Sequence, residues 1–267
     1  PRRKRRGYRI HPVRMLFALG LLAAVVVVAA LLVNYAASRR GYEQLREEAL
    51  VTPVPAVVTP APTRQAQPAA TPQPTPEIAF AVDWAALKRI NRDVRAWLYG
   101  PGTNLNYPVV QTEDNEYYLT HDFERGESDV GALFFDCETE FTNGFENWMI
   151  YGHRRNDGSM FGSLVEFAED GYRREHPRLY LFTEEETYRV ELFSCRTVHA
   201  YPEYFTLWFK NERAFQRYID KAVEHSYWTP DFTADTAYPI LTLATCSTYS
   251  HDDAPRLLVH GRLVPIG

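Results

Sequence analysis

The sequence lacks the short motifs by which metal and nucleotide enzymes are identified. It contains no HExxH pattern, no paired CxxC spacing and no glycine-rich phosphate loop, and no segment repeats at a fixed period. Metalloprotease, zinc-ribbon and P-loop functions therefore have no support in this chain.

Acidic residues are absent before Glu43, although nine Lys or Arg residues occur there. The remaining 20 basic and 34 acidic residues give residues 43–267 a formal charge of −14, while the whole chain carries −5. A domain this acidic argues against nucleic acid as a partner, because nucleic-acid binding needs a basic surface. The basic N-terminus is better explained by membrane topology.

Cysteine is scarce, with Cys137, Cys195 and Cys246 in 267 residues. An odd number leaves one thiol unpaired, and an unpaired thiol outside the membrane is a candidate reactive group. A Cys137–Cys195 disulfide is one alternative. Each of these two residues lies in an apolar, strand-like run, however, and we interpret both as core residues.

The one long apolar run covers residues 15–33 and is long enough to cross a hydrocarbon core of ~30 Å. The basic residues before it predict a cytoplasmic tail at residues 1–14 and an uncleaved, single-pass signal anchor at residues 15–36. The outer domain then lies on the extracellular side. Cleavage near Ala36–Ser38 is the alternative, because small residues occur there.

Residues 37–76 are predicted to be a short charged helix followed by a linker. Eight prolines between residues 53 and 76 prevent a packed core and favour an extended chain. At ~3.1 Å per residue, this linker would form a stalk reaching roughly 70 Å from the bilayer.

The remaining residues, 77–267, are predicted to be one mainly β domain with α additions. Asp83 is a helix N-cap, because apolar residues at helical spacing follow it. Short apolar runs separated by turns predict a closed β-barrel. The expected strands are 107–110, 130–137, 148–151, 178–182, 187–195, 240–245 and 256–263, and the expected helices are 84–90, 160–167 and 214–223.

A nucleophile, a base and an oxyanion donor are all suggested by strand ends. Cys246 ends an apolar strand and precedes a polar segment, His153 ends another strand, and Arg256 opens the last strand. A cysteine nucleophile needs a group that favours its thiolate, and acyl transfer needs a donor for the oxyanion. If the last two strands form a hairpin, Arg256 lies beside Cys246. The competing interpretations are a core cysteine at Cys246 and a solvated strand-end arginine at Arg256. Arg262, on the same strand, is a second arginine that could be mistaken for the oxyanion donor.

Seven other histidines have ordinary explanations. His11 lies before the membrane span, and His260 alternates within the last strand as a packed or exposed residue. The others lie in polar, turn-like contexts and are interpreted as surface residues: His121, His176, His199, His225 and His251.

The sequence Thr242–Cys246 matches the TLxTC signature of sortases, with Arg256 and the Tyr151–His153 segment at matching places. Further segments resemble class B sortases in particular, and together they cover roughly residues 80–263. These segments are 101–104, 107–111, 114–119 and 157–161.

This resemblance implies an eight-stranded sortase-type barrel with a helix before it and a helix between late strands. It implies a cysteine transpeptidase that cleaves the C-terminal sorting signal of secreted proteins at a Thr carbonyl through a thioacyl enzyme. An amine of the peptidoglycan cross-bridge, of its lipid-linked precursor or of another protein would then accept the acyl group.

The resemblance also implies roles for particular residues. Cys246 would be the nucleophile, His153 the general acid and base, and Arg256 the oxyanion donor. The residues that would line the signal-binding groove are Asn115, Leu119, Ala244 and Thr245, with the loop 201–207 as a further wall. No acidic calcium site resembles that of class A enzymes, so no metal and no cofactor is expected.

Three other functions remain open at this point. A pilin-polymerising sortase and a membrane-anchored cysteine protease would use the same residues. A tethered binding module would use Cys246 only as a core residue. An L,D-transpeptidase is disfavoured, because the glycines and the arginine of its cysteine motif are absent here.

Overall fold

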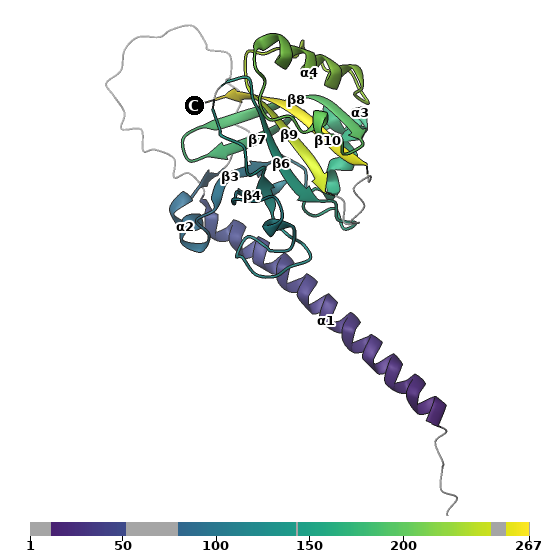
Figure 1. The fold of residues 1–267 in the computed structure, drawn as a ribbon. Coiled ribbons are helices and arrows are strands. Elements are labelled where there is room, and N and C mark those ends of the chain that lie inside the picture. The colour runs from purple at the N-terminus through teal and green to yellow at the C-terminus, as the bar shows by residue number, and fades with distance from the viewer. Residues whose placement is uncertain (1–11, 52–79, 143, 247–254, 267) are drawn as a thin grey trace, which may run out of the picture. The chain divides into compact units, whose positions relative to one another are not determined.

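The computed structural model describes residues 12–51, 80–142, 144–246 and 255–266. The chain forms two compact units, Pro1–Gly41 and Tyr42–Gly267. Figure 1 shows the elements, which are, in chain order, α1 (Pro12–Ala49), β1 (Leu50–Val51), β2 (Ala81–Val82), α2 (Trp84–Ile90), β3 (Val94–Tyr99), β4 (Asn106–Val110), η1 (Tyr117–Leu119), β5 (Leu133–Phe135), β6 (Asn147–His153), η2 (Gly162–Ala168), α3 (Asp170–Glu175), β7 (Arg178–Thr183), β8 (Thr187–Val198), η3 (Pro202–Tyr204), α4 (Glu212–Glu224), β9 (Ile240–Cys246) and β10 (Arg256–Pro265).

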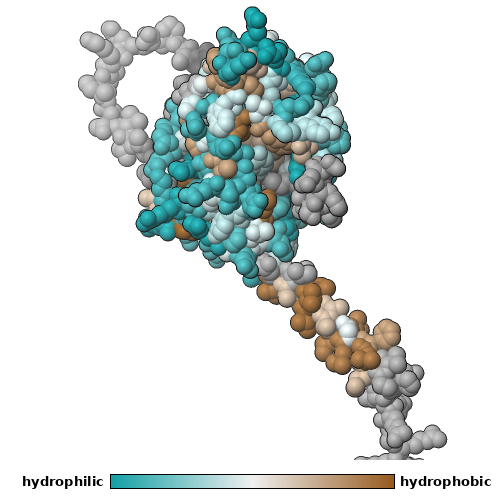
Figure 2. Space-filling model, viewed as in Figure 1, coloured by the Kyte–Doolittle hydropathy of each residue, from teal (hydrophilic) through white to brown (hydrophobic). Residues whose placement is uncertain are grey.

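The first unit consists of the N-terminal part of α1. Its large apolar side chains, such as Phe17, Leu21 and Val26, are exposed, and Figure 2 shows them as a brown surface along the helix. A helix with apolar residues around its exposed surface is suited to lipid rather than to water. Within the described part of the chain, α1 is the one helix that meets the length and composition of a membrane span. It is therefore a candidate span, while most of the predicted basic tail, residues 1–11, lies outside the described residues.

The second unit is built on a closed barrel of eight strands, in the order β10-β8-β7-β3-β4-β5-β6-β9. The pairs β4–β5 and β6–β9 are parallel, and the other pairs are antiparallel. Closure gives each of these eight strands a partner on both sides, which protects their edges from pairing with other chains. The predicted eight-stranded barrel is confirmed.

Helices α2 and α4 are the two additions to the barrel that the resemblance implied, while the third expected helix, 160–167, is the 3₁₀ helix η2. Asp83 caps α2 by accepting a hydrogen bond from the backbone N–H of Ala86 at 2.9 Å. Helix α4 connects β8 to β9, and its buried residues Phe215 and Ile219 pack in a cluster with Phe193 of β8. Both helices therefore lie where the resemblance to class B sortases implied them.

The last turns of α1 belong to the barrel unit rather than to the apolar helix before them. Tyr42, Leu45 and Ala49 are buried in its core, and β1 pairs with β2. The proline-rich segment over residues 53–76 lies outside the described residues. The compact unit begins at Tyr42 and includes both β1 and β2.

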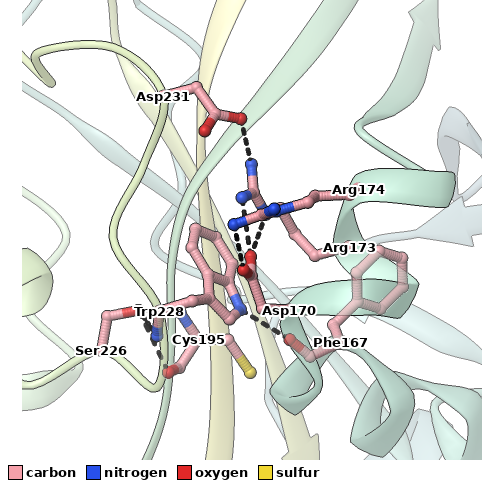
Figure 3. Close-up of polar contacts among 8 residues, drawn as sticks. All are labelled: Phe167, Asp170, Arg173, Arg174, Cys195, Ser226, Trp228 and Asp231. Atoms are coloured by element: carbon pink, nitrogen blue, oxygen red, sulfur yellow. Dashed lines mark hydrogen bonds and ion pairs between the residues drawn. The ribbon is translucent and has the colours of Figure 1, made fainter.

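A buried arginine joins α3 to the segment that precedes β9. Arg173 forms ion pairs with Asp170 and Asp231, and its guanidinium lies 4.8 Å from the centre of the Trp228 ring (Figure 3). Hydrogen bonds from Arg173 hold the pKa of both carboxyls below the usual range. Because both partners are supplied, the buried charge is compatible with a stable fold.

Two local predictions need correction. The sequence pattern does not predict β3, because its middle residues, Ala96–Leu98, are buried on both faces of the strand and show no polar alternation. Strand β5 covers only three of the residues 130–137, so Cys137 follows the strand in a turn where Thr139 N–H bonds to the Asp136 carbonyl. Cys137 is only half-buried, and its interpretation as a core residue is therefore wrong.

Candidate active site

The three residues predicted to carry the chemistry lie at the same end of three neighbouring strands, β6, β9 and β10. His153 ends β6 and Cys246 ends β9, and the two are register partners in the parallel β6–β9 pair. Strand β10 runs antiparallel to β9, with Leu258 opposite Ala244. The same register, continued by two residues, brings Arg256 opposite Cys246. The predicted hairpin of the last two strands is confirmed.

These strand ends adjoin an apolar cluster that is separate from the main core. On β6, Trp148 and Ile150 belong to the main core, whereas Met149 and Tyr151 lie on the other face. His153 follows in the same alternation, because successive residues of a strand face opposite ways. The buried members of the separate cluster are Met149, Val198, Leu207, Ala244 and Leu258.

The imidazole of His153 is oriented by a backbone carbonyl. Its Nε2 lies 2.6 Å from the carbonyl oxygen of Leu119. A carbonyl oxygen only accepts hydrogen bonds, so Nε2 carries a hydrogen and Nδ1 is the nitrogen left for proton transfer. Nδ1 is buried and has no hydrogen-bond partner among the described residues.

Gly131 lies close to Cδ2 of the same ring. Its φ is +65°, and a Cβ at this position would lie 2.9 Å from Cδ2 of His153 and 2.7 Å from the Tyr118 carbonyl oxygen. The chain at Gly131, just before β5, therefore runs so close to the imidazole that a side chain does not fit there. No motif in the sequence points to this contact.

Arg256 and Arg262, the two arginines of β10, have different surroundings. The guanidinium of Arg262 contacts the Glu191 carboxylate at 2.7 Å through both Nε and Nη2. Nη1 of Arg256 is buried and has no partner among the described residues. An unpaired buried guanidinium nitrogen is costly unless it serves a ligand. Of the two, Arg256 is therefore the one available to an oxyanion.

A hydrogen-bonded group lies beside the strand ends and includes one predicted groove residue. Asn115 donates to Asp136 at 3.1 Å and accepts from the backbone N–H of Cys137 at 2.8 Å. The Tyr151 hydroxyl donates to the same Asp136 carboxylate at 2.9 Å. The sequence assigns no role to either residue, because Tyr151 enters only as part of the segment that resembles sortases and Asp136 does not enter at all. Tyr151 lies two residues before His153, so strand alternation is a signal that would find it.

The other predicted groove residues differ in what they expose. Leu119 is half-buried, and its carbonyl holds His153. Ala244 is fully buried in the cluster beneath the strand ends, and the Thr245 hydroxyl accepts a hydrogen bond from Leu257 N–H at 3.0 Å. The Thr245 side chain therefore joins β9 to β10. Neither side chain is therefore free to contact substrate in this arrangement. Their predicted role in binding would use backbone groups or a changed arrangement of the site, and it stays a prediction.

The loop 201–207, the predicted further wall, packs against the same face. Tyr204 and Phe205 contact the apolar cluster, and the Phe205 and Tyr151 rings are stacked with centres 6.4 Å apart. Leu207 accepts a hydrogen bond from Asn147 N–H at the start of β6. This loop is thus fixed alongside β6.

Neither of the other cysteines is suited to be the nucleophile. Burial raises the pKa of Cys195 to about 12, and its N–H is bound by Ser226 beside Trp228 (Figure 3). Burial and the neighbouring Asp136 and Glu138 carboxylates raise the pKa of Cys137. A nucleophilic cysteine needs the opposite shift. The side chain of Cys246 and the polar segment after it, with His251, lie outside the described residues.

His260 is a packed strand histidine, one of the two alternatives for it. It is fully buried next to Phe193 and Tyr218, and burial, with Arg196 nearby, lowers its pKa well below the usual value. It is therefore neutral and remote from the strand ends. No group of three or more His, Cys, Asp or Glu residues could hold a metal ion in the described part of the chain.

Comparison with known proteins gives one family. The family model described as the sortase domain matches residues 98–264. Sortase B of Listeria monocytogenes is 31% identical over 180 residues, covering 67% of this chain and 72% of the relative. Sortase B of Staphylococcus aureus is 28% identical over 181 residues, covering 68% and 74%.

Solved structures agree with these relatives. The crystal structure of Staphylococcus aureus sortase B superposes with a TM-score of 0.66 at 28% identity, covering 69% of this chain and 87% of that one. Sortase B from Bacillus anthracis, solved in complex with AAEK1, gives 0.70 at 26% identity, covering 88% and 100%. The chain therefore belongs to the sortase family, in which it resembles the class B enzymes throughout its barrel, and it is a sortase-type cysteine transpeptidase.

Proposed function

We propose that this enzyme cleaves a C-terminal sorting signal of secreted proteins at a Thr carbonyl and transfers the protein to an amine acceptor of the peptidoglycan. The observation that carries this proposal is the register of β6, β9 and β10, which brings His153, Cys246 and Arg256 to one strand end. A nucleophile, a base and an oxyanion donor are the minimum set for acyl transfer.

In the proposed acylation, the Cys246 thiolate bonds to the carbonyl carbon of the signal's Thr. The negative charge that develops on the carbonyl oxygen accepts hydrogen bonds from Arg256. Collapse of this intermediate breaks the following C–N bond, and protonated His153 gives its Nδ1 proton to the leaving amine. A thioacyl enzyme and a free C-terminal peptide result.

In the proposed transfer, an acceptor amine attacks the thioester. His153 takes a proton from the attacking nitrogen, and the C–S bond breaks to regenerate the thiolate. His153 suits both steps because Leu119 holds its Nε2–H and leaves Nδ1 for the proton. One sortase B structure contains triglycine, and a structure of Staphylococcus aureus sortase B contains a substrate. These complexes support the proposal that the present chain also uses an amine acceptor and a peptide donor.

The signal is proposed to lie between the segment that contains Asn115 and Leu119 and the loop 201–207. Both flank β6, and both present half-buried side chains beside the catalytic strand ends. Asn115 offers an amide, while Tyr204 and Phe205 offer aromatic surface. Backbone groups of Ala244 and Thr245 would complete the groove next to Cys246.

Membrane attachment is proposed to put this chemistry at the cell surface. The candidate span in α1 follows seven basic residues at positions 1–14, which favours a cytoplasmic N-terminus and an extracellular barrel. Secreted proteins and the amines of the cross-bridge or its lipid-linked precursor are then within reach on the same side.

The test uses the full chain in detergent micelles with a small library of fluorogenic sorting peptides and an amine acceptor, analysed by mass spectrometry. We expect a thioacyl adduct on Cys246 and an amine-ligated product. Both should disappear in Cys246→Ala and His153→Ala and persist in Cys137→Ala, the control for loss of a half-buried cysteine.

The alternatives give different products. Adducts that only hydrolyse would indicate a cysteine protease, and ligation to a lysine of a co-incubated pilin, without ligation to the small amine, would indicate a pilin polymerase. If Cys246 formed no adduct with any peptide and resisted alkylation, the catalytic assignment would be contradicted. The tethered binding module would then be the remaining alternative.

A further inference from the structure

We propose that Tyr42, in the last turns of α1 and at the start of the barrel unit, is a positioning residue for His153. This inference rests on the proposed function, in which His153 transfers the proton. It extends the active-site support beyond the barrel to the last turns of α1.

Tyr42 is attached to the segment before β5 by a buried hydrogen bond. The Tyr42 hydroxyl donates a hydrogen bond to the carbonyl oxygen of Gly131 at 2.9 Å, and both residues are buried. The bond joins residues 89 positions apart in the sequence. It fixes the backbone at Gly131, because a buried carbonyl that loses its donor is unfavourable.

Gly131, in turn, lies next to the imidazole of His153. The position of a Cβ on Gly131 is 2.9 Å from Cδ2 of His153 and 3.1 Å from the Leu119 carbonyl oxygen that binds Nε2. The next residue, Ala132, donates its N–H to the Tyr118 carbonyl oxygen at 3.0 Å. A shift at Gly131 therefore moves both the surface that contacts the ring and the segment that orients it.

A second set of contacts leads to the same histidine. The Tyr42 ring packs edge-on against Tyr107 with centres 5.5 Å apart, and the Tyr107 hydroxyl accepts a hydrogen bond from Met160 N–H at 3.2 Å. The adjacent Phe161 donates its N–H to the His153 carbonyl oxygen at 3.0 Å. Tyr42 thus contacts two residues that lead to His153. Gly131 lies next to its ring, and Tyr107 binds the segment that holds its backbone carbonyl.

The remaining contacts of this segment hold Tyr42 in place. Arg46 donates to the Asn106 carbonyl oxygen at 2.8 Å and lies 4.8 Å from the centre of the Tyr107 ring, while Leu45 is buried one turn from Tyr42. The hydroxyl of Tyr42 is therefore presented by a docked helix. Its removal changes one hydrogen bond and leaves the docking surface intact.

The test measures alkylation of Cys246 by iodoacetamide between pH 5 and 9 on the full chain in micelles, with the adduct located by peptide mapping. Alkylation needs the thiolate, and a positioned His153 imidazolium lowers the midpoint of its pH profile. We expect Tyr42→Phe to move the midpoint toward that of His153→Ala and to slow alkylation at pH 7 by roughly tenfold. Tyr227→Phe, which removes an exposed hydroxyl bonded to Thr197, should match the wild type.

A structural role is separated from positioning by Leu45→Ala, which loosens the same helix without touching Gly131. We expect it to lower the melting temperature more than Tyr42→Phe does, yet to shift the alkylation profile less. A Tyr42→Phe profile that matches the wild type, or a Leu45→Ala shift at least as large, would overturn the role of Tyr42 and leave the proposed function standing. If the wild-type profile were identical to that of His153→Ala, His153 would not be the base. That result would contradict the proposed function as well.

Discussion

The backbone of Gly131 touches the imidazole of His153 with no room for a side chain between them. The φ of +65° and the 2.9 Å that would separate an added Cβ from Cδ2 of His153 each favour glycine, for independent reasons. Two backbone groups, at Gly131 and at the Leu119 carbonyl, are thus next to the ring.

Gly131→Ala is expected to inactivate the enzyme without abolishing the fold. The added methyl would displace His153, and a misplacement of about 1 Å costs on the order of a hundredfold in rate. The left-handed backbone adds a cost of about 1–3 kcal/mol in the free energy of unfolding. Thioacyl formation and thermal melting measure the two effects.

Gly171→Ala is the matched control for that substitution. Gly171 lies in α3, and a Cβ there has no neighbour within 4 Å. Alanine should be neutral or stabilising by roughly 0.5–1 kcal/mol, because it lowers the entropy of the unfolded chain. Equal activities of the two glycine variants would contradict the close contact with His153.

Asn115→Ala is expected to destabilise the barrel as well as to weaken substrate binding. Asn115 supplies the acceptor for Cys137 N–H and a donor to Asp136. A buried group left unpaired costs about 1–3 kcal/mol, which thermal melting would detect in the absence of substrate. Asn104→Ala, at an exposed asparagine, should leave the melting temperature unchanged. A raised KM with wild-type stability would assign Asn115 to the groove alone.

Sequence patterns were sufficient for the parts of this fold that depend on local periodicity. The Asp83 cap, helix α4 and the two final strands all follow from residue spacing. The number of strands, eight, came instead from the resemblance to sortases. The same resemblance assigned roles to Cys246, His153 and Arg256, which their places at strand ends had already made candidates. Their juxtaposition depends on the parallel β6–β9 pairing, which no local pattern contains.

The contacts around His153 could not be predicted because they join segments far apart in the sequence. The Leu119 carbonyl and the Gly131 backbone lie at the ring, and the Tyr42 hydroxyl binds the Gly131 carbonyl from a third segment. Strand β3 was missed for a related reason, since burial on both faces removes the polar alternation that marks a strand. What determines such features is the tertiary neighbour rather than the adjacent sequence.

The thiol of Cys195 is expected to make the barrel less stable in alkali. Its pKa is raised by burial to about 12, against ~8.5 in an unfolded chain. A raised pKa contributes stability that is complete below the unfolded value and is lost as the pH rises toward the folded value. The loss is about 1.4 kcal/mol per pH unit above ~8.5.

Cys195→Ala isolates this effect. It should lower the melting temperature at pH 7, because a packed side chain is lost. The difference from the wild type should then shrink between pH 8.5 and 10.5, since the variant has no thiol to ionise. Tyrosine ionisation is common to both proteins and cancels in the comparison. Parallel melting curves over this range would contradict a protonated, buried Cys195.

The two arginines of β10 are expected to separate activity from stability. Arg256→Gln should slow thioacyl formation by about 10²–10³-fold, the usual effect of removing an oxyanion donor, with little change in melting temperature. Arg262→Gln should lower the melting temperature and leave the rate unchanged, because Arg262 is bound to Glu191. If Arg262→Gln abolished activity while Arg256→Gln retained it, the oxyanion donor would have to be reassigned.

The stability lost in Arg262→Gln is expected to depend on pH through Glu191. Burial alone would raise the pKa of Glu191, but hydrogen bonds from Arg262 and Arg189 outweigh it and hold that pKa below the usual value. A lowered pKa contributes stability that is present above the unfolded value of ~4.3 and is lost as the pH falls through the folded value. The melting difference between Arg262→Gln and the wild type should therefore be full at pH 7 and shrink below pH ~4. A difference that stayed constant from pH 7 to pH 3 would show that Arg262 stabilises the barrel through packing instead of through the Glu191 carboxylate.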